Sequence, residues 1–250
     1  MLCLPDLPVI YDRYLTFTRI SRERYGESLA RKLIFVNCFD GRGVATVVAA
    51  TIAGAATLCV DDDAGRLREG LRTGLCDFVV GNLDEAVRIL KNEVRRGLAV
   101  SVGLMLNEEA CIAAMAERGV QPDLLAIEGE RYRDAAGVFR DRGAIELPED
   151  EAPDSGFALL MWSVASEPAR SLPRIAELAA AAFDPARPDT AARRNWLTRA
   201  PRTLGRAFGS RQCSRMAAAE VGSFLDRIRS EFPEAVVTRD GESIQPPADK

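Results

Sequence analysis

The sequence contains no histidine. Without an imidazole group, the chain cannot form a Ser-His or Cys-His nucleophilic pair or a histidine-ligated metal centre, and it has no histidine general base. Any proton transfer must therefore use a carboxyl, amino, phenol or thiol group, or a bound cofactor.

Two other signals are missing as well. The six cysteines are scattered and none forms a Cys-X-X-Cys pair, so we expect buried, reduced thiols and no zinc or iron–sulfur site. No apolar run approaches the roughly 18 residues of a membrane span, and the first residues lack the basic-then-apolar pattern of a signal peptide. The formal net charge of −4 gives no general attraction to nucleic acid. We expect a cytoplasmic protein with no membrane partner.

The chain does have alternating apolar runs and helical patterns from residue 14 onward. Short strand-like runs lie at 33–36, 57–60, 77–80, 99–106 and 124–127. Helical patterns separate these runs, and this alternation is typical of parallel sheets. The sequence therefore predicts an α/β fold, with a Rossmann-like parallel sheet and helices on both faces, followed by a mostly helical C-terminal region.

The composition and the pattern of apolar residues change near residue 150. We predict a dinucleotide-binding Rossmann domain over 1–150, opening with a Pro-rich arm (1–13) and a helix (14–25). An acidic linker (146–156) leads into an extension over 151–250, with one possible further strand at 157–164. The extension is predicted to contain Ala- and Arg-rich helices at 173–183, 190–207 and 215–232, and a disordered tail from Glu234.

The stretch 32–63 has the order strand, glycine turn, helix, strand and acid that holds dinucleotides. Gly41 and Gly43 allow the backbone to approach a phosphate at the start of the helix. Asp61, at the end of the second strand, can accept hydrogen bonds from ribose hydroxyls. Two glycines also fit a tight turn without a ligand. The three adjacent carboxylates of Asp61, Asp62 and Asp63 could instead bind a hard cation, but Asp63 also suits a helix N-cap, and we expect no metal there.

Longer segments carry a family resemblance. They are YLTF (14–17), YGESLARKLIF (25–35), AATIAGAATLCVDDD (49–63), GRLREGLRTGLCD (65–77), NLDEAV (82–87), SVGL (101–104) and ERGVQPDLL (117–125). Over residues 14–125 the chain resembles the NAD-binding domain of the urocanase (urocanate hydratase) family. The resemblance implies a tightly bound NAD+ that acts as an electrophile: the substrate imidazole adds to the nicotinamide, and water is then added.

The resemblance also implies where NAD would be held. Gly41 and Gly43 match two glycines of the family's phosphate loop, and Asp61 stands where the family has a ribose-binding glutamate. Arg66 is kept, and Asn107 survives from a later Gly-Asn pair. The predicted cofactor-binding residues are therefore these five.

The chain departs from the family in the same loops. Asp40 and Val44 stand at glycine positions, and Thr46 begins the replacement of a Gln-Pro pair. A β-branched residue disfavours a positive φ, and a carboxylate repels phosphate. Residues 127–133 replace the family segment that wraps the cofactor. We find no counterpart of the segments that supply the catalytic acid and base, so we do not expect self-sufficient urocanate hydration.

Two main hypotheses follow. The chain is a urocanase-like protein that binds NAD and acts with a separate catalytic subunit, by self-association or on another substrate, as a lyase (hydratase) relative. Alternatively, it is a non-catalytic interaction or regulatory protein on a degenerate scaffold that has lost its cofactor.

Two further classes have weaker signals. The predicted C-terminal helices contain many arginines close together in the sequence, with two aromatic residues among them. Nucleic-acid-binding surfaces have this composition, because arginines neutralise phosphates and aromatic rings stack on bases. The residues are Arg193, Arg194, Arg199, Arg202, Arg206, Arg211 and Arg215, with Trp196 and Phe208. A solvated helix face explains the same pattern, and we do not expect nucleic acid as a partner. For a dehydrogenase, the sequence offers only Tyr132 as a candidate residue at the hydride-transfer site, and we interpret it as a surface tyrosine.

Overall fold

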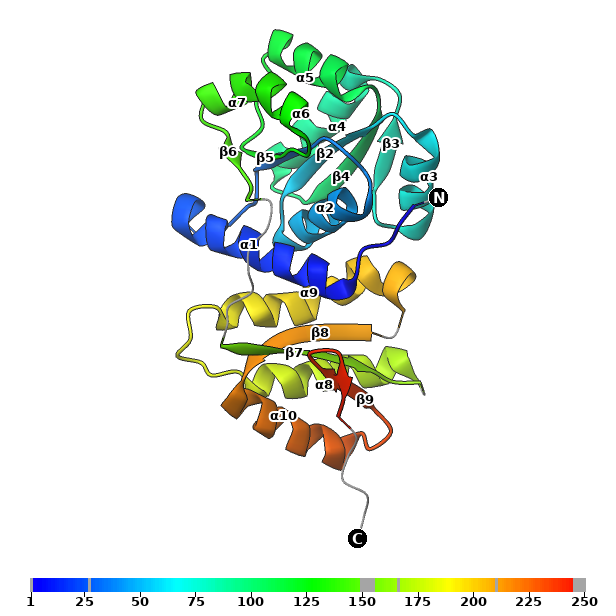
Figure 1. Ribbon diagram of the computed structural model, residues 1–250, viewed down its shortest axis with the longest axis vertical. Helices are drawn as coiled ribbons and strands as arrows, with labels where there is room; N and C mark the ends of the chain where they lie inside the picture. The colour runs from blue at the N-terminus through cyan, green and yellow to red at the C-terminus, as the bar shows by residue number, and fades with distance from the viewer. Residues whose placement is uncertain (1, 27, 149–155, 166, 210, 245–250) are drawn as a thin grey trace. The chain divides into compact units, whose positions relative to one another are not determined.

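The structure, a computed structural model, describes residues 2–26, 28–148, 156–165, 167–209 and 211–244 (Figure 1). The chain divides into two compact units, Met1–Glu151 and Ala152–Lys250. Most of the predicted linker, residues 149–155, lies outside the described residues, as do residues 245–250 of the predicted tail.

The first unit is built on a parallel sheet of six strands in the order β3-β4-β2-β1-β5-β6. The strands are β1 (Leu33–Val36), β2 (Ala56–Asp61), β3 (Phe78–Val80), β4 (Val100–Met105), β5 (Leu124–Ala126) and β6 (Ile145–Glu146). Every strand pairing in this sheet is parallel. The predicted Rossmann-like α/β architecture is confirmed.

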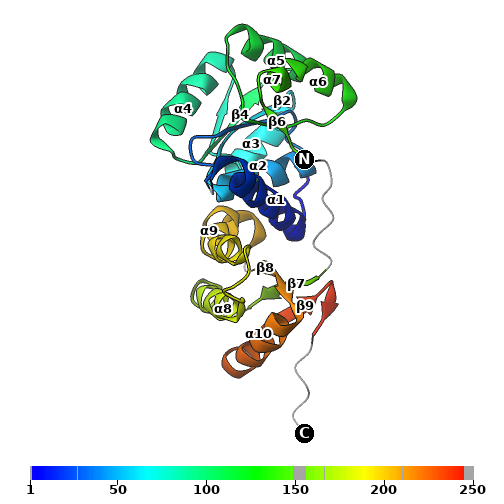
Figure 2. The same cartoon turned by 90° about the vertical axis from the view of Figure 1, so that its left-hand side faces the viewer.

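Helices cover both faces of this sheet (Figures 1 and 2). They are α1 (Leu7–Tyr25), α2 (Gly41–Ala53), α3 (Ala64–Thr73), α4 (Leu83–Arg96), α5 (Glu108–Glu117), α6 (Glu130–Ala135) and α7 (Gly137–Asp141). Ala56, Leu58 and Val60 of β2 point into the core beneath α4 and α5. Because side chains alternate along a strand, Cys59 and Asp61 point to the opposite face, toward α2 and α3.

Capping residues set the helix ends. Asp63 is the N-cap of α3, and its carboxylate accepts hydrogen bonds from the main-chain N–H groups of Gly65 and Arg66. The N-cap interpretation of Asp63 is therefore confirmed. The start of α1 corrects the sequence analysis: the helix begins at Leu7, not at residue 14, because Pro8 suits a first helical turn, where its missing N–H costs nothing.

The second unit contains an antiparallel sheet in the order β10-β9-β7-β8. Its strands are β7 (Phe157–Ser163), β8 (Arg211–Ala217), β9 (Val236–Arg239) and β10 (Glu242–Ser243), and its helices are α8 (Pro168–Ala182), α9 (Thr190–Phe208) and α10 (Ala218–Glu231). The helices and β7 were expected. The other three strands were not expected. The last residues of β8, 215–217, were predicted to begin the last helix, and β9 and β10 lie in the predicted tail. Among the described residues, no helix is both long enough and apolar enough to cross a membrane.

Candidate functional site

The strand order creates a topological switch point at the carboxyl ends of β1 and β5. The chain moves from β1 to β2 on one side and places β5 on the other, and ligands of open parallel sheets bind at such a crevice. A side-chain amide joins the two loops here. The Nδ2 of Asn37 donates to the carbonyl of Glu128 at 2.9 Å, and its Oδ1 accepts from the N–H of Glu128 at 2.7 Å.

Asp40 occupies the amide groups that would bind a phosphate. It is the N-cap of α2, and its Oδ1 accepts hydrogen bonds from the N–H groups of Arg42 and Gly43, both at 3.1 Å. A phosphate bound at a helix N-terminus uses main-chain N–H groups of this kind. In this protein a carboxylate of the chain already accepts from them.

The two predicted glycines differ in their surroundings. A Cβ on Gly43 would lie 2.1 Å from the carbonyl oxygen of Cys38, so the turn after β1 leaves no room for a side chain. A Cβ on Gly41 would lie 3.8 Å from the carbonyl oxygen of Cys3, which is an ordinary contact. Close backbone packing alone therefore accounts for the glycine at position 43.

Asp61 is fully buried, and its carboxylate is saturated. Its Oδ2 accepts from the N–H of Phe39 at 2.8 Å and from Nε of Arg66 at 3.0 Å. Its Oδ1 accepts from the N–H of Asp63 and from Nη2 of Arg66, both at 2.7 Å. The hydrogen bond with Asp61 raises the pKa of the Arg66 guanidinium. Four donors use the usual acceptor capacity of a carboxylate, so the predicted ribose acceptor is engaged within the chain.

Asn107 lies apart from the other predicted residues. Its side chain caps α5 by accepting from the N–H of Ala110, at the end of β4. In the sheet order, β4 is separated from β1 by β2. The structure therefore brings Asp61 together with Arg66, and Asp40 together with both glycines, while Asn107 has a helix-capping role of its own.

Val44 and Thr46, the two other residues that depart from the family's phosphate loop, fit the helix without strain. Val44 is buried within α2, and its N–H donates to the carbonyl of Asp40 at 2.7 Å. The strain expected from a β-branched residue at a positive φ does not arise, because the helix begins at Gly41. The Thr46 hydroxyl donates to the carbonyl of Arg42 at 3.1 Å.

The space at the switch point is small. The cavity there measures about 20 Å³ and is lined by residues that include Arg13, Cys38, Arg42 and Glu128. That volume suits about one water molecule, whereas cofactor pockets measure roughly 300–1,000 Å³. In this conformation the residues do not fit a dinucleotide held in the manner that the resemblance implies.

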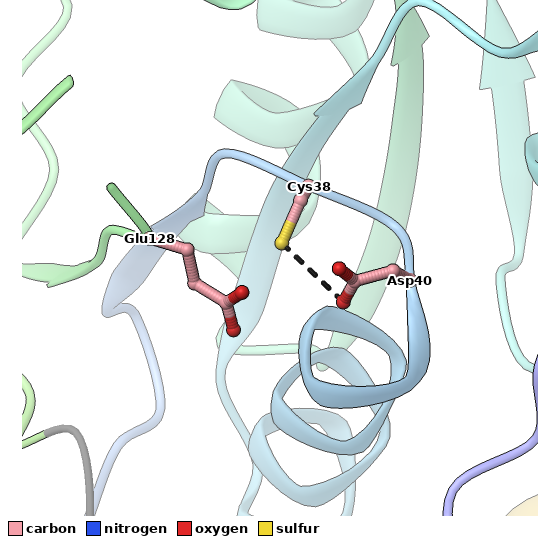
Figure 3. Close-up of side chains that lie close together, drawn as sticks. All are labelled: Cys38, Asp40 and Glu128. Atoms are coloured by element: carbon pink, nitrogen blue, oxygen red, sulfur yellow. Dashed lines mark hydrogen bonds between the residues drawn. The ribbon is translucent and has the colours of Figure 1, made fainter. Parts of the chain in front are cut away.

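A thiol and two carboxylates converge beside this cavity (Figure 3). The Sγ of Cys38 donates to Oδ1 of Asp40 at 3.6 Å, and the Glu128 carboxylate points toward both. Burial, followed by the charges of Asp40 and Glu128, raises the pKa of the Cys38 thiol. Burial and the charge of Asp40 also raise the pKa of Glu128. This group cannot be seen in the sequence, because Cys38 and Glu128 follow different strands and only the sheet brings them together.

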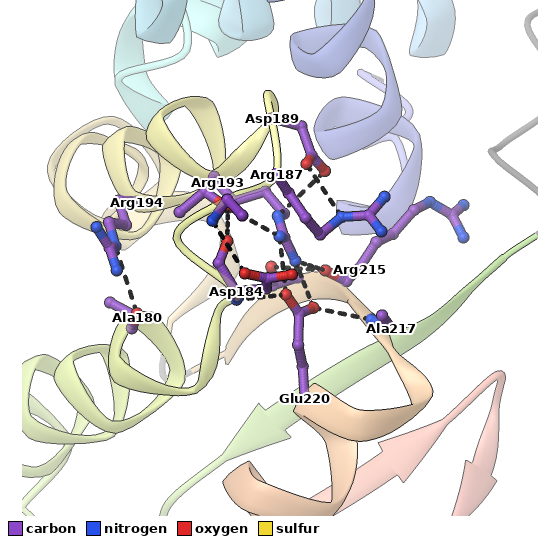
Figure 4. Close-up of polar contacts among 12 residues, drawn as sticks. Ala180, Asp184, Arg187, Asp189, Arg193, Arg194, Arg215, Ala217 and Glu220 are labelled. Atoms are coloured by element: carbon purple, nitrogen blue, oxygen red, sulfur yellow. Dashed lines mark hydrogen bonds and ion pairs between the residues drawn. The ribbon is translucent and has the colours of Figure 1, made fainter.

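The arginine-rich helices have a largely structural explanation (Figure 4). Arg193 is fully buried, and its guanidinium donates to both oxygens of Glu220, at 2.6 and 3.0 Å. Trp196 and Phe208 are buried too, and the indole N–H of Trp196 donates to the carbonyl of Cys213 at 2.9 Å. These aromatic rings belong to the core of the second unit and are not available to stack on bases.

The other arginines of that pattern differ in exposure. Arg194, Arg199, Arg202 and Arg211 are exposed and Arg215 is half-buried, while the side chain of Arg206 lies outside the described residues. Tyr132, which was interpreted as a surface tyrosine, is partly buried and packs against the core of the first unit.

Residues 9–132 match the family model described as the urocanase Rossmann-like domain. The match covers the turn after β1, the whole of α2 and α3, and the loop after β5. The resemblance identified from the sequence is confirmed over this part of the chain.

Proposed function

Residues 9–132 form a urocanase Rossmann-like domain, a domain type associated with NAD in its family, and from this premise we propose that the chain has kept the scaffold and lost the open cofactor site. It then serves as a non-catalytic interaction or regulatory protein. One observation carries the proposal: the chain's own carboxylates engage the groups that would otherwise hold a dinucleotide.

Two sets of contacts support this proposal. Asp40 accepts from the N–H groups at the start of α2, where a pyrophosphate would be bound. Asp61 accepts from Arg66 and from two main-chain N–H groups, where ribose hydroxyls would need free acceptor positions. A dinucleotide would have to displace the first carboxylate and break the buried ion pair of the second.

The energetic consequence can be estimated. Disrupting a buried, hydrogen-bonded ion pair costs about 3–5 kcal/mol. Each 1.4 kcal/mol changes a dissociation constant about tenfold. A site with an intrinsic micromolar affinity for NAD would therefore bind it with a dissociation constant of roughly 0.1–4 mM, which is too weak to retain a resident cofactor.

The second candidate function is NAD binding in concert with a separate catalytic polypeptide or a second copy. The family match favours it, as does the retention of Gly41, Gly43 and Arg66 at the positions that the resemblance assigns. This function requires a rearranged first turn of α2, with Asp40 turned away from the helix N-terminus.

Mass spectrometry of small molecules released from the natively purified protein separates the two candidates. The proposal expects no dinucleotide, and no hydration of urocanate when NAD+ is added. Release of about one NAD per chain would overturn it in favour of the second candidate.

A further inference from the structure

We propose that Cys38, Asp40 and Glu128 form a binding site for one zinc-like divalent cation at the switch point of the first unit. Each side chain offers one ligand atom, and the three atoms lie within 4.8 Å of one another. Figure 3 shows the three side chains converging from the loop after β1, the start of α2 and the loop after β5. A thiolate with carboxylate oxygens is a donor set that Zn²⁺ accepts.

The spacing suits a tetrahedral centre with little movement. Bond lengths of about 2.3 Å to sulfur and 2.0 Å to oxygen place two ligand atoms of such a centre about 3.5 Å apart. The Sγ of Cys38 is already 3.6 Å from the Asp40 carboxylate, measured to its capping oxygen Oδ1, and a small rotation of that carboxylate brings Oδ2 to the cation at a similar spacing. The Glu128 carboxylate closes the remaining gap by a rotation of its flexible side chain.

The framework around these ligands is well supported. The hydrogen bonds between the Asn37 side chain and the main chain of Glu128 hold the two loops together. In the described ranges, the donors to the Asp40 carboxylate all use Oδ1, so its second oxygen can bind a cation while the helix cap persists. The cavity of about 20 Å³ that Cys38 and Glu128 line has room for one water as a fourth ligand.

The local charges favour a cation and also show what competes with it. The carboxylates of Asp40 and Glu128 each bring a ligand atom to within 4.8 Å of the Cys38 sulfur, and a divalent cation would offset their two negative charges. The Nε of Arg42 lies 3.5 Å from Oε1 of Glu128, and the positive charge of Arg13 also attracts that carboxylate. Both arginines compete with a cation. Arg42 is half-exposed and can turn to solvent, so we expect it to limit the affinity without blocking the site.

Binding involves proton release and no oxidation. The S–H bond of Cys38 breaks as its sulfur binds the cation, and the proton passes to solvent. This site is separate from the aspartates considered as cation ligands in the sequence analysis, since Asp61 is saturated and Asp63 caps α3.

A metal titration tests the proposal directly. The full-length, chelator-treated protein is titrated with Zn²⁺ against a chromophoric chelator, and with Co²⁺ to detect sulfur-to-metal charge transfer. We expect one site per chain with a thiolate band. Cys38→Ser and Glu128→Gln should each weaken binding at least about tenfold, and Arg42→Gln should strengthen it.

Cys3→Ser is the matched control, because Cys3 is an exposed thiol outside the cluster. It should leave both the stoichiometry and the absorption band unchanged. Equal binding by wild type and Glu128→Gln, or loss of the band in Cys3→Ser alone, would overturn the proposal and leave only adventitious binding at a surface thiol. Glu128→Gln keeps the side-chain volume, so circular dichroism separates loss of the site from loss of the fold. The outcome is independent of whether NAD binds.

Discussion

At the scale of single residues, Asp61 and Arg66 explain most about the candidate site. The sequence placed Asp61 correctly at the end of a strand, because an apolar run followed by an acid is a strong pattern. It could not show that Arg66, in the first turn of the next helix, reaches back to the same carboxylate. The resemblance implies that both residues contact the cofactor, whereas in the structure they bind each other.

The pair makes a direct stability prediction. Arg66→Ala leaves the buried Asp61 carboxylate with two main-chain donors and no counterion, so the free energy of unfolding of the first unit should fall by about 3 kcal/mol. Both tryptophans, Trp162 and Trp196, lie in the second unit, so their fluorescence does not report on the first. Urea unfolding is therefore followed by far-UV circular dichroism.

Arg72→Ala is the matched control. Arg72 lies on the same helix and also pairs with a carboxylate, that of Glu69, but this pair is exposed to solvent. Exposed pairs contribute little to stability, so this variant should unfold like the wild type. Equal losses in the two variants would mean that Asp61 is not buried as described.

The two glycines of the first turn give a second prediction. Gly43→Ala drives a Cβ into the carbonyl group of Cys38 and should destabilise the first unit by about 1–3 kcal/mol or more. Gly41→Ala has room and should be neutral or slightly stabilising, since alanine favours a helix. Thermal unfolding of both variants checks this. A tolerated Gly43→Ala would show that the glycine is not required by packing.

At the scale of elements, the buried ion pair beneath α9 predicts a pH dependence. Burial opposes ionisation of Glu220, but hydrogen bonds from Arg193 and from the N–H groups of Asp184 and Ala217 hold its pKa below the ordinary 4.5. A lowered folded-state pKa adds stability above the ordinary value and loses it as pH falls through the folded-state value. The second unit should therefore lose stability as pH falls below about 4.5.

Glu220→Gln removes this titration and also leaves Arg193 without its closest counterion. At neutral pH it should destabilise the second unit by about 3 kcal/mol, and its stability should vary less with pH in the acidic range. Tryptophan fluorescence during urea unfolding reports on this unit. Glu177→Gln is the control, since Glu177 pairs with Arg174 on the surface. An unchanged acid dependence in Glu220→Gln would contradict this assignment.

The elements also show where sequence patterns are insufficient. The strands from β1 to β5 were predicted to within a few residues, because each is a short apolar run between helical patterns. Strand β8 was missed because two of its buried residues, Gln212 and Ser214, are polar, so no apolar alternation appears. Gln212 is buried because it accepts a hydrogen bond from the indole of Trp162.

Strands β9 and β10 carried a signal that was not used. Asp240 and Gly241 join them, both with a positive φ, and an Asp-Gly pair between two strand-like runs is a strong hairpin pattern. The flanking strands have only four and two residues, so the apolar alternation that would accompany a hairpin is weak here.

At the scale of the whole molecule, the first unit has a core of its own. Its central cluster draws on the sheet and on α4, α5 and α7, and includes Phe35, Leu58, Leu90, Met115 and Phe139. A fragment ending at residue 148 should therefore fold alone, with a cooperative urea transition by circular dichroism. A fragment without such a transition would contradict the division into two independent cores.

The central claim concerns the whole first unit: its own carboxylates take the place of a dinucleotide. Equilibrium dialysis of the full-length protein against NAD+ and ADP-ribose tests it most directly, with Arg66→Ala measured alongside. The account predicts no saturable binding by the wild type below about 0.1 mM ligand. One NAD+ per chain with a dissociation constant of about 10 µM or lower would contradict it and show that Asp40 and Asp61 release their partners to a cofactor.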